Sequence, residues 1–259
     1  MNELTKPMPP EELRAAISKA ANELYLTVFS QYGKYVNLKA SLEENLLTLL
    51  TEQNQLAFQN RIKRRVRAAG FPQTKTMEMF QMTKDILPNL NFDEVLELTT
   101  CKFIDDKIDV CAFSPSGHGK THLALAIGYE AVKRGYTVRF RRASDLINEM
   151  AEAQSEKKLS DYIRLMTRCS LLIVDEVGYF DYDAAASSLL FQIIGARYET
   201  GSTFYTSNQM FSEWGKFIGK DTLAKAIVSR IAHNAVLLDL NGPKAWRLEH
   251  ARSRRVKLE

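Results

Sequence analysis

The sequence has few cysteines, no long apolar run and little net charge. Its three cysteines, Cys101, Cys111 and Cys169, show neither C-x-x-C spacing nor histidines in ligand register, which excludes a disulfide framework and a zinc site. Nowhere do about 18 consecutive apolar residues occur, and the first residues lack the pattern of a secretory signal, so we expect a cytoplasmic protein without a membrane segment. The net charge of +4 is too small by itself to indicate nucleic-acid binding.

What the chain does have is an ordinary globular composition, with 45% apolar and 25% charged residues, and this predicts a folded core. Apolar residues at helical spacing over 11–29 predict one amphipathic helix. Ser41 and Glu44 form a capping box that predicts a second helix over about 42–69, ended by Gly70. We therefore expect a helical domain over 1–70 and a second domain over 71–259.

From about residue 91, short apolar runs alternate with helical stretches, a texture typical of a parallel α/β sheet. Five strands are expected, at 110–113, 137–140, 171–175, 203–206 and 236–240. Helices are expected near 92–99, 120–134, 144–156, 184–198 and 222–233.

A phosphate-binding loop follows the first expected strand. Residues 114–121, Ser-Pro-Ser-Gly-His-Gly-Lys-Thr, match the P-loop pattern G-x-x-x-x-G-K-[ST], except that Ser114 replaces the first glycine. We expect Ser114 to be tolerated because the Gly-Lys-Thr end is intact. The loop glycines let successive N–H groups point at a phosphate at a helix N-terminus, Lys120 neutralises phosphate oxygens, and Thr121 offers its hydroxyl to Mg²⁺. The expected nucleotide contacts of this motif are Ser116, Gly117, His118, Gly119, Lys120, Thr121 and His122.

A pair of acidic residues ends the third expected strand, in the Walker B pattern of P-loop nucleotidases. Asp175 is expected to hold Mg²⁺ together with Thr121, and Glu176 to polarise the attacking water. Asn208 follows the fourth expected strand, where its amide would orient water or contact the γ-phosphate. An asparagine at a strand end is also a common turn former, so Asn208 alone is a weak signal.

Taken together, these motifs resemble those of the IstB-type transposition helper ATPases, which belong to the AAA+ class and are related to the DnaC helicase loaders. The resemblance also rests on 206–208 (Thr-Ser-Asn), 211–214 (Phe-Ser-Glu-Trp) and 227–233 (Ile-Val-Ser-Arg-Ile-Ala-His), and covers about Arg64 to Arg247. It implies an AAA+ core with a parallel five-stranded sheet, preceded by a small helical domain.

The resemblance also assigns roles to three residues. It implies that Asn208 is the sensor-1 residue. Arg230 matches the arginine finger, which reaches the ATP site of a neighbouring subunit, so a homo-oligomer with shared ATP sites is implied. Arg247, in Ala-Trp-Arg-Leu where the family usually has Tyr-Arg-Leu, matches a sensor-2-like contact to the nucleotide.

The basic residues gather in three runs, at 61–75, 133–142 and 244–257, and the remainder of the chain is acidic. One such run is most often a solvated face, whereas three in one ATPase favour duplex DNA, bound through its phosphates with a strong salt dependence. The residues expected to bind DNA are Arg61, Lys63, Arg64, Arg65, Arg67, Lys133, Arg134, Arg139, Arg141 and Arg142.

We therefore expect an ATP- and Mg²⁺-dependent, DNA-binding AAA+ ATPase that oligomerises on target DNA, remodels it, and recruits and activates a transposase. A DnaC-like loader of a replicative helicase is the alternative within the same fold. A small-molecule kinase is disfavoured by the acidic pair, Asn208 and the basic runs, and a non-hydrolysing binder is disfavoured by Glu176. The N-terminal helices are expected to contact the transposase or a neighbouring subunit, and the sequence does not choose between them.

Overall fold

The structure is a computed structural model that describes residues 9–81, 83–219, 221–243 and 245. The chain divides into two compact units between Arg64 and Arg65, a few residues before the boundary expected near residue 70. The N-terminal unit is helical, and the second unit holds the sheet. No helix in the described ranges is both long and apolar enough to cross a bilayer.

The N-terminal unit begins with two helices where one was expected over 11–29. Helix α1 (Pro10–Glu23) ends early, and α2 (Thr27–Ser30) follows after a short turn. The turn places Tyr25 in the left-handed region, with a φ of 57°, which a continuous helix cannot contain. The expectation of a single helix was therefore wrong.

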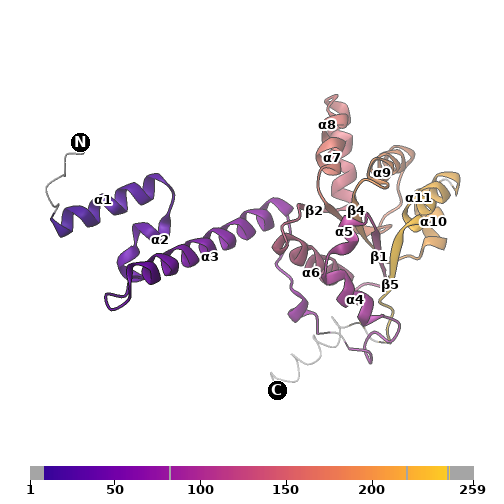
Figure 1. Cartoon of the computed structure of the whole chain (residues 1–259). Helices are drawn as coiled ribbons and strands as arrows, with labels where there is room; N and C mark the ends of the chain where they lie inside the picture. The colour runs from indigo at the N-terminus through magenta and orange to yellow at the C-terminus, as the bar shows by residue number, and fades with distance from the viewer. Residues whose placement is uncertain (1–8, 82, 220, 244, 246–259) are drawn as a thin grey trace, which may run out of the picture. The chain divides into compact units, whose positions relative to one another are not determined.

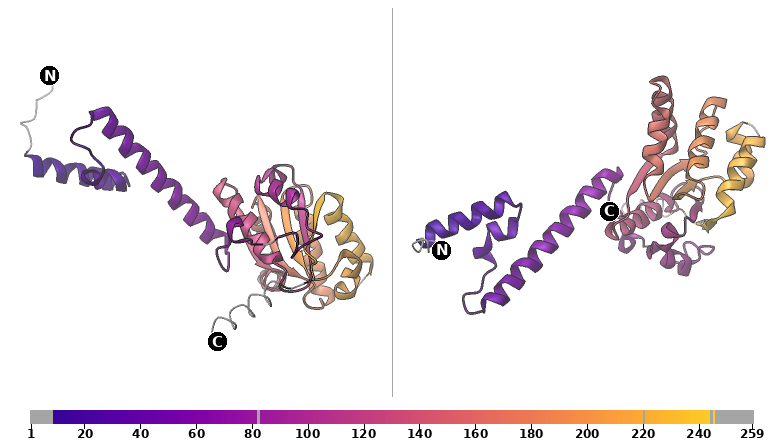
Figure 2. Two further views of the ribbon diagram at one scale, coloured as in Figure 1. Left: turned by 90° about the horizontal axis from the view of Figure 1, so that it is seen from below. Right: turned by 45° about the horizontal axis from the view of Figure 1, so that its top comes forward.

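Helix α3 (Leu42–Ala69) is continuous over 28 residues (Figures 1 and 2). The predicted capping box is present, because the Glu44 N–H donates to Ser41 Oγ at 3.1 Å and the Ser41 N–H donates to Glu44 Oε2 at 2.7 Å. Gly70 has a φ of 73° directly after the helix, the left-handed conformation that commonly ends helices. The sequence therefore predicted both ends of α3.

The described part of the second unit contains five strands, the helices α4 to α11 and two short 3₁₀ turns. The strands are β1 (Asp109–Phe113), β2 (Val138–Arg142), β3 (Leu171–Val177), β4 (Ser202–Ser207) and β5 (Ala235–Asp239). The helices are α4 (Phe92–Thr99), α5 (Lys102–Asp105), α6 (Lys120–Lys133), α7 (Ala143–Ser155), α8 (Leu159–Thr167), α9 (Ala184–Arg197), α10 (Trp214–Ile218) and α11 (Asp221–His233). The 3₁₀ turns of the chain are η1 (Tyr32–Lys34), η2 (Met77–Met79) and η3 (Phe211–Glu213).

The five strands form one parallel sheet in the order β2-β3-β4-β1-β5. Helix α6 packs on one face, and α7, α9 and α11 belong to the layer on the other face (Figure 1). The three central strands, β3, β4 and β1, are buried on both faces, and of these β1 and β3 read as apolar runs in the sequence. The predicted five-stranded parallel α/β fold is confirmed. In such a sheet the carboxyl ends of all strands meet at one edge, where ligands bind.

Two elements differ from expectation in a way that matters for function. Strand β2 was expected to end at Phe140, but it continues to Arg142 in register with Asp175 of β3. It therefore carries two arginines toward the carboxyl edge of the sheet. Helix α8 was not expected, and it lies beside α7, which it contacts (Figure 1).

Candidate nucleotide site

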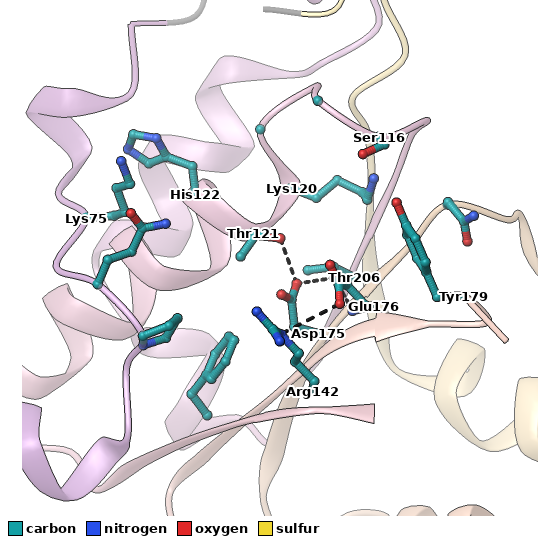
Figure 3. A pocket seen from close by; sticks show the side chains of 16 residues that line it. Lys75, Ser116, Lys120, Thr121, His122, Arg142, Asp175, Glu176, Tyr179 and Thr206 are labelled. Carbon is teal, nitrogen blue, oxygen red and sulfur yellow. Dashed lines mark hydrogen bonds and ion pairs between the residues drawn. The ribbon is translucent and has the colours of Figure 1, made fainter. Parts of the chain in front are cut away.

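A cavity of about 400 Å³ lies at the carboxyl edge of the sheet, where β1, β3 and β4 end (Figure 3). Residues from the P-loop, the strand ends and the segment after α3 line it. They are Pro72, Gln73, Lys75, Ser116, Gly117, Gly119, Lys120, Thr121, His122, Phe140, Arg142, Asp175, Glu176, Tyr179, Thr206 and Asn208.

The P-loop connects β1 to α6 through two glycines in the left-handed region, Gly117 with a φ of 90° and Gly119 with a φ of 92°. A side chain at either position would be strained, so glycine is needed there. Ser114 keeps a negative φ, and its N–H donates to the Ser207 carbonyl at 3.3 Å. The first position of the motif therefore does not require glycine in this chain, which is consistent with the expected tolerance of Ser114.

Lys120 is the first residue of α6 and is buried. Its Nζ donates to the Ser114 carbonyl at 2.5 Å and to the Pro115 carbonyl at 3.0 Å. These two hydrogen bonds hold the ammonium group against the backbone of the P-loop. In this position it faces the same loop whose N–H groups suit a phosphate.

Asp175 is buried at the end of β3 and accepts two hydroxyl hydrogen bonds at its Oδ1 atom (Figure 3). Thr121 Oγ1 donates at 2.8 Å and Thr206 Oγ1 donates at 2.6 Å. The geometry brings together the predicted pair Thr121 and Asp175, from α6 and β3. The fixed carboxylate and the hydroxyl beside it form a compact set of hard oxygen donors.

Glu176 lies at an irregularity of β3, where the register with β4 shifts between Val174 and Val177. Its φ of 62° is unusual for a residue with a side chain, and such strain persists mainly at functional sites. The Glu176 N–H donates to Thr206 Oγ1 at 2.9 Å, which fixes the kink. The bulge turns the glutamate carboxylate into the cavity, beside Asp175.

An arginine faces this glutamate. Arg142 Nε lies 3.7 Å from Glu176 Oε2, and both side chains are about half exposed. An ion pair in such contact with water contributes at most about 1 kcal/mol. The pair is therefore easily separated, and Arg142, which was expected to bind DNA, lines the nucleotide cavity.

The remaining predicted nucleotide-site residues differ in where they lie. Ser116, His122 and Asn208 line the cavity. His122 Nε2–H donates to the Thr76 carbonyl at 3.3 Å, and burial lowers the pKa of its imidazole. His118 does not line the cavity, because its ring is buried with Nδ1 at 3.2 Å from the Pro115 carbonyl oxygen and Nε2 at 3.3 Å from that of Gly242.

Arg230 does not line the cavity of its own chain. It lies on α11, with its guanidinium carbon 4.1 Å from the ring centroid of Phe191 on α9, a cation–π contact that holds it at the surface. The second predicted arginine, Arg247, lies outside the described residues, as does most of the basic run 244–257.

The run 133–142 does not form one basic surface. Lys133 pairs with Glu130 at 2.6 Å, Arg134 Nε donates to the Thr99 carbonyl at 3.1 Å, and Arg141 Nε pairs with Glu149 at 2.8 Å. Of the remaining residues expected to bind DNA, Arg61, Lys63, Arg64 and Arg67 are exposed on α3, while Arg65 and Arg139 are half-buried.

Several cavity residues were missed in the sequence. Thr206 was included in an expected strand but given no role, although its hydroxyl connects Asp175 to the backbone of Glu176. Lys75, Gln73 and Tyr179 also line the cavity. The one available signal was the position of Thr206 at the end of the strand next to Walker B, since polar residues at carboxyl strand ends face the site.

Known proteins have related sequences, and solved structures share the fold. The sequence model of the family described as IstB-like ATP binding protein matches residues 20–254. The insertion sequence IS5376 putative ATP-binding protein of Geobacillus stearothermophilus is 34% identical over 231 residues, 89% of this chain and 90% of the relative. The insertion sequence IS21 putative ATP-binding protein of Pseudomonas aeruginosa is 31% identical over 242 residues, 93% of this chain and 90% of the relative.

Two solved structures show the same fold at low sequence identity. AMPPCP-bound DnaA from Aquifex aeolicus superposes with a TM-score of 0.55 at 22% identity, over 71% of this chain and 55% of that one. The DnaC helicase loader superposes with a TM-score of 0.52 at 19% identity, over 69% of this chain and 99% of that one. The chain belongs to the family of IstB-like ATP binding proteins, and it is an ATPase with the AAA+ fold.

Proposed function

We propose that this ATPase binds duplex DNA, assembles on it into an oligomer with shared ATP sites, and recruits and activates a transposase. The observation that carries the proposal is the acidic pair Asp175 and Glu176 beside a P-loop with an intact Gly-Lys-Thr end, in a chain whose relatives are ATP-binding proteins of insertion sequences. The likeness to DnaC is one of fold, at 19% identity, and does not favour a helicase loader.

The proposed hydrolysis depends on four side chains of this chain. The Lys120 ammonium and the P-loop N–H groups bind the phosphates, and the Glu176 carboxylate accepts a proton from the attacking water. Thr206 positions both acids through its two hydrogen bonds. Asn208 lies at the same cavity and orients the water or contacts the terminal phosphate.

The donor set fits Mg²⁺. Thr121 Oγ1 and Asp175 Oδ1 lie 2.8 Å apart, and Mg²⁺ is typically bound by one or two protein oxygens together with substrate phosphates and water. Within the described ranges, no group of three or more His, Cys, Asp or Glu side chains offers a self-sufficient metal site. When bound, Mg²⁺ neutralises charge on the phosphate oxygens, and Thr121 and Asp175 are the residues that hold it.

One experiment tests the proposal: the ATPase rate with and without duplex DNA, for the wild type and for Glu176→Gln. We expect DNA to stimulate turnover, and the variant to lose about 10²- to 10⁴-fold in rate because the general base is removed. ATP-dependent assemblies on DNA should remain in the variant. Glu97→Gln, at an exposed glutamate of α4, is the matched control and should keep the wild-type rate. DNA that neither binds nor alters the rate would refute the proposal.

Shared sites are tested by mixing two inactive variants. Arg230→Ala keeps its own P-loop, while Lys120→Ala keeps its Arg230. If Arg230 acts in the site of a neighbour, the mixture regains part of the ATPase rate, because some Arg230→Ala subunits then receive an arginine from a Lys120→Ala subunit. A mixture as inactive as its components would place Arg230 outside the catalytic machinery.

A further inference from the structure

A second hollow lies in the ATPase unit, at the opposite end of β2 from the nucleotide cavity. It has a volume of about 200 Å³ and contains three arginines, Arg65 from the end of α3, Arg139 from β2, and Arg168 directly after α8. Four apolar or small side chains form the rest of its wall together with Thr137: Ala68, Val138, Leu165 and Cys169. All eight residues belong to the second unit.

These arginines differ from most others of the unit in having no ion-pair, hydrogen-bond or aromatic partner for the guanidinium group. Elsewhere the guanidinium groups have partners: Arg134 with Thr99, Arg141 with Glu149, Arg142 with Glu176, Arg164 with Asp161, Arg197 with Ser202, and Arg230 with Phe191. The guanidinium groups of Arg65, Arg139 and Arg168 make no ion pair or hydrogen bond within the described part of the chain. Arg67, exposed on α3, is a fourth such residue.

The positions of the three are fixed by the fold. Arg65 lies against the α6–β2 turn, where its Nη1 atom is 3.1 Å from the point that a Cβ on Gly135 would occupy. Arg139 is half-buried on β2, and Arg168 is exposed at the C-terminal cap of α8. The end of α3, strand β2 and the end of α8 are distant in sequence, and together they bring three arginines without ion-pair partners to one hollow.

Guanidinium groups that converge in this way suit a phosphate, because each planar fork donates two parallel hydrogen bonds to its oxygens. The apolar wall beside them suits the sugar of a nucleotide backbone better than a free, fully hydrated anion. We propose that this hollow binds the phosphodiester backbone of duplex DNA. The inference rests on the proposed function and names the surface that performs its DNA-binding step.

The proposed surface differs from the basic runs seen in the sequence. It takes one arginine from each of two runs and adds Arg168, which lies in neither. It leaves out Arg141 and Arg142, which belong to the other end of β2 and are paired with glutamates. DNA bound at the hollow would therefore contact the amino end of β2, and ATP the carboxyl end.

The test is a titration of duplex DNA by fluorescence anisotropy at several salt concentrations. Arg65→Gln, Arg139→Gln and Arg168→Gln are combined in one variant. The matched control combines Arg14→Gln, Lys102→Gln and Arg164→Gln, which remove the same charge at sites outside the hollow. The inference predicts that the slope of log K against log salt falls by about one per arginine, roughly three in all, in the hollow variant alone.

Folding is checked by the thermal unfolding midpoint of both variants. If the triple variant unfolds, Arg168→Gln alone, at an exposed residue, must lower the slope by about one. Wild-type and hollow-variant proteins that bind DNA with the same slope overturn this inference and leave the proposed function standing. A wild type that binds no DNA overturns both. If no DNA binds, and inorganic phosphate protects the wild type but not the hollow variant against unfolding, the hollow is assigned to a free anion instead.

Discussion

The two units of the chain place their large apolar side chains in opposite ways. Of the described residues of the N-terminal unit, the fully buried apolar ones are Ala21, Val28 and Leu49. Leu38 is 96% exposed and Tyr25 is 88% exposed, and further leucines of α1 and α3 face water. The ATPase unit, about three times as long, buries its strands and most of the apolar faces of its helices.

The difference separates two uses of apolar surface. In the ATPase unit, burial stabilises a sheet whose edge must hold the nucleotide residues in fixed positions. In the N-terminal unit, apolar side chains that remain in water contribute little to its own stability and are the kind of surface that binds other proteins. The predicted contact of the N-terminal helices with a transposase or a neighbouring subunit is consistent with this surface.

The largest expected effect is on the free energy of unfolding, and it comes from making the same Leu→Ala change in each unit. Leu190 of α9 is 1% exposed within the main core cluster, and Leu49 of α3 is 6% exposed in a unit with few buried neighbours. We expect Leu190→Ala to lower the free energy of unfolding by about 4 kcal/mol and Leu49→Ala by about 2 kcal/mol, both within the usual range of about 2 to 5 kcal/mol for this change. Chemical denaturation of the full chain measures both. Equal losses of unfolding free energy in the two variants would contradict the proposed difference in packing between the two units.

A second effect concerns a partly buried acid in the ATPase unit. Asp109, the first residue of β1, accepts a hydrogen bond from the Thr203 N–H at 2.7 Å, and burial raises the pKa of its carboxyl to about 7. Because the folded state holds the proton more tightly than the unfolded chain, this carboxyl stabilises the fold at acidic pH. That stabilisation is lost as the pH rises through about 7.

Asp109→Asn keeps the acceptor oxygen but cannot ionise. We expect the stability advantage of the variant over the wild type to grow by about 2 to 3 kcal/mol from pH 5 to pH 8, because the unfolded carboxyl is already ionised at pH 5 while the folded one ionises only near pH 7. Thermal unfolding at the two pH values measures the difference. An unchanged gap between the two proteins from pH 5 to pH 8 would show that Asp109 ionises as easily in the folded state as in the unfolded chain.

The sequence predicted the parts of the fold and site that depend on local patterns. Buried parallel strands read as apolar runs, and the P-loop and the Asp175-Glu176 pair are contiguous motifs whose neighbours fix their geometry. The capping box of α3 is equally local, because Ser41 and Glu44 are three residues apart. These features needed no knowledge of the tertiary structure.

Features that depend on register or on distant segments were not predictable in the same way. The role of Thr206 requires β4 to lie beside β3 with its hydroxyl between Asp175 and Glu176, and threonine is common in any strand. Arg142 reaches the nucleotide cavity because β2 extends two residues past Phe140. Arg168 joins the basic hollow through α8, which was not predicted although Leu159, Ile163 and Met166 stand at helical spacing.

The smallest expected effect on stability tests the apolar surface of the N-terminal unit. Leu47 of α3 and Leu96 of α4 are both 67% exposed, one in each unit, and form a matched pair. We expect Leu47→Gln and Leu96→Gln each to change the free energy of unfolding by no more than about 0.5 kcal/mol, as exposed substitutions usually do. Their effects on assembly should nevertheless differ. Leu47→Gln should weaken binding to a partner, while Leu96→Gln should not.

Two measurements on this pair identify the partner. Sedimentation of the full chain with ATP and DNA reports self-assembly, and co-sedimentation with the transposase reports recruitment. Loss of self-assembly in Leu47→Gln alone assigns the surface to a neighbouring copy. Loss of transposase binding with self-assembly intact assigns it to the transposase. If both variants behave like the wild type in both measurements, the exposed leucine of α3 is not part of a binding surface, and the contrast between the units is one of stability alone.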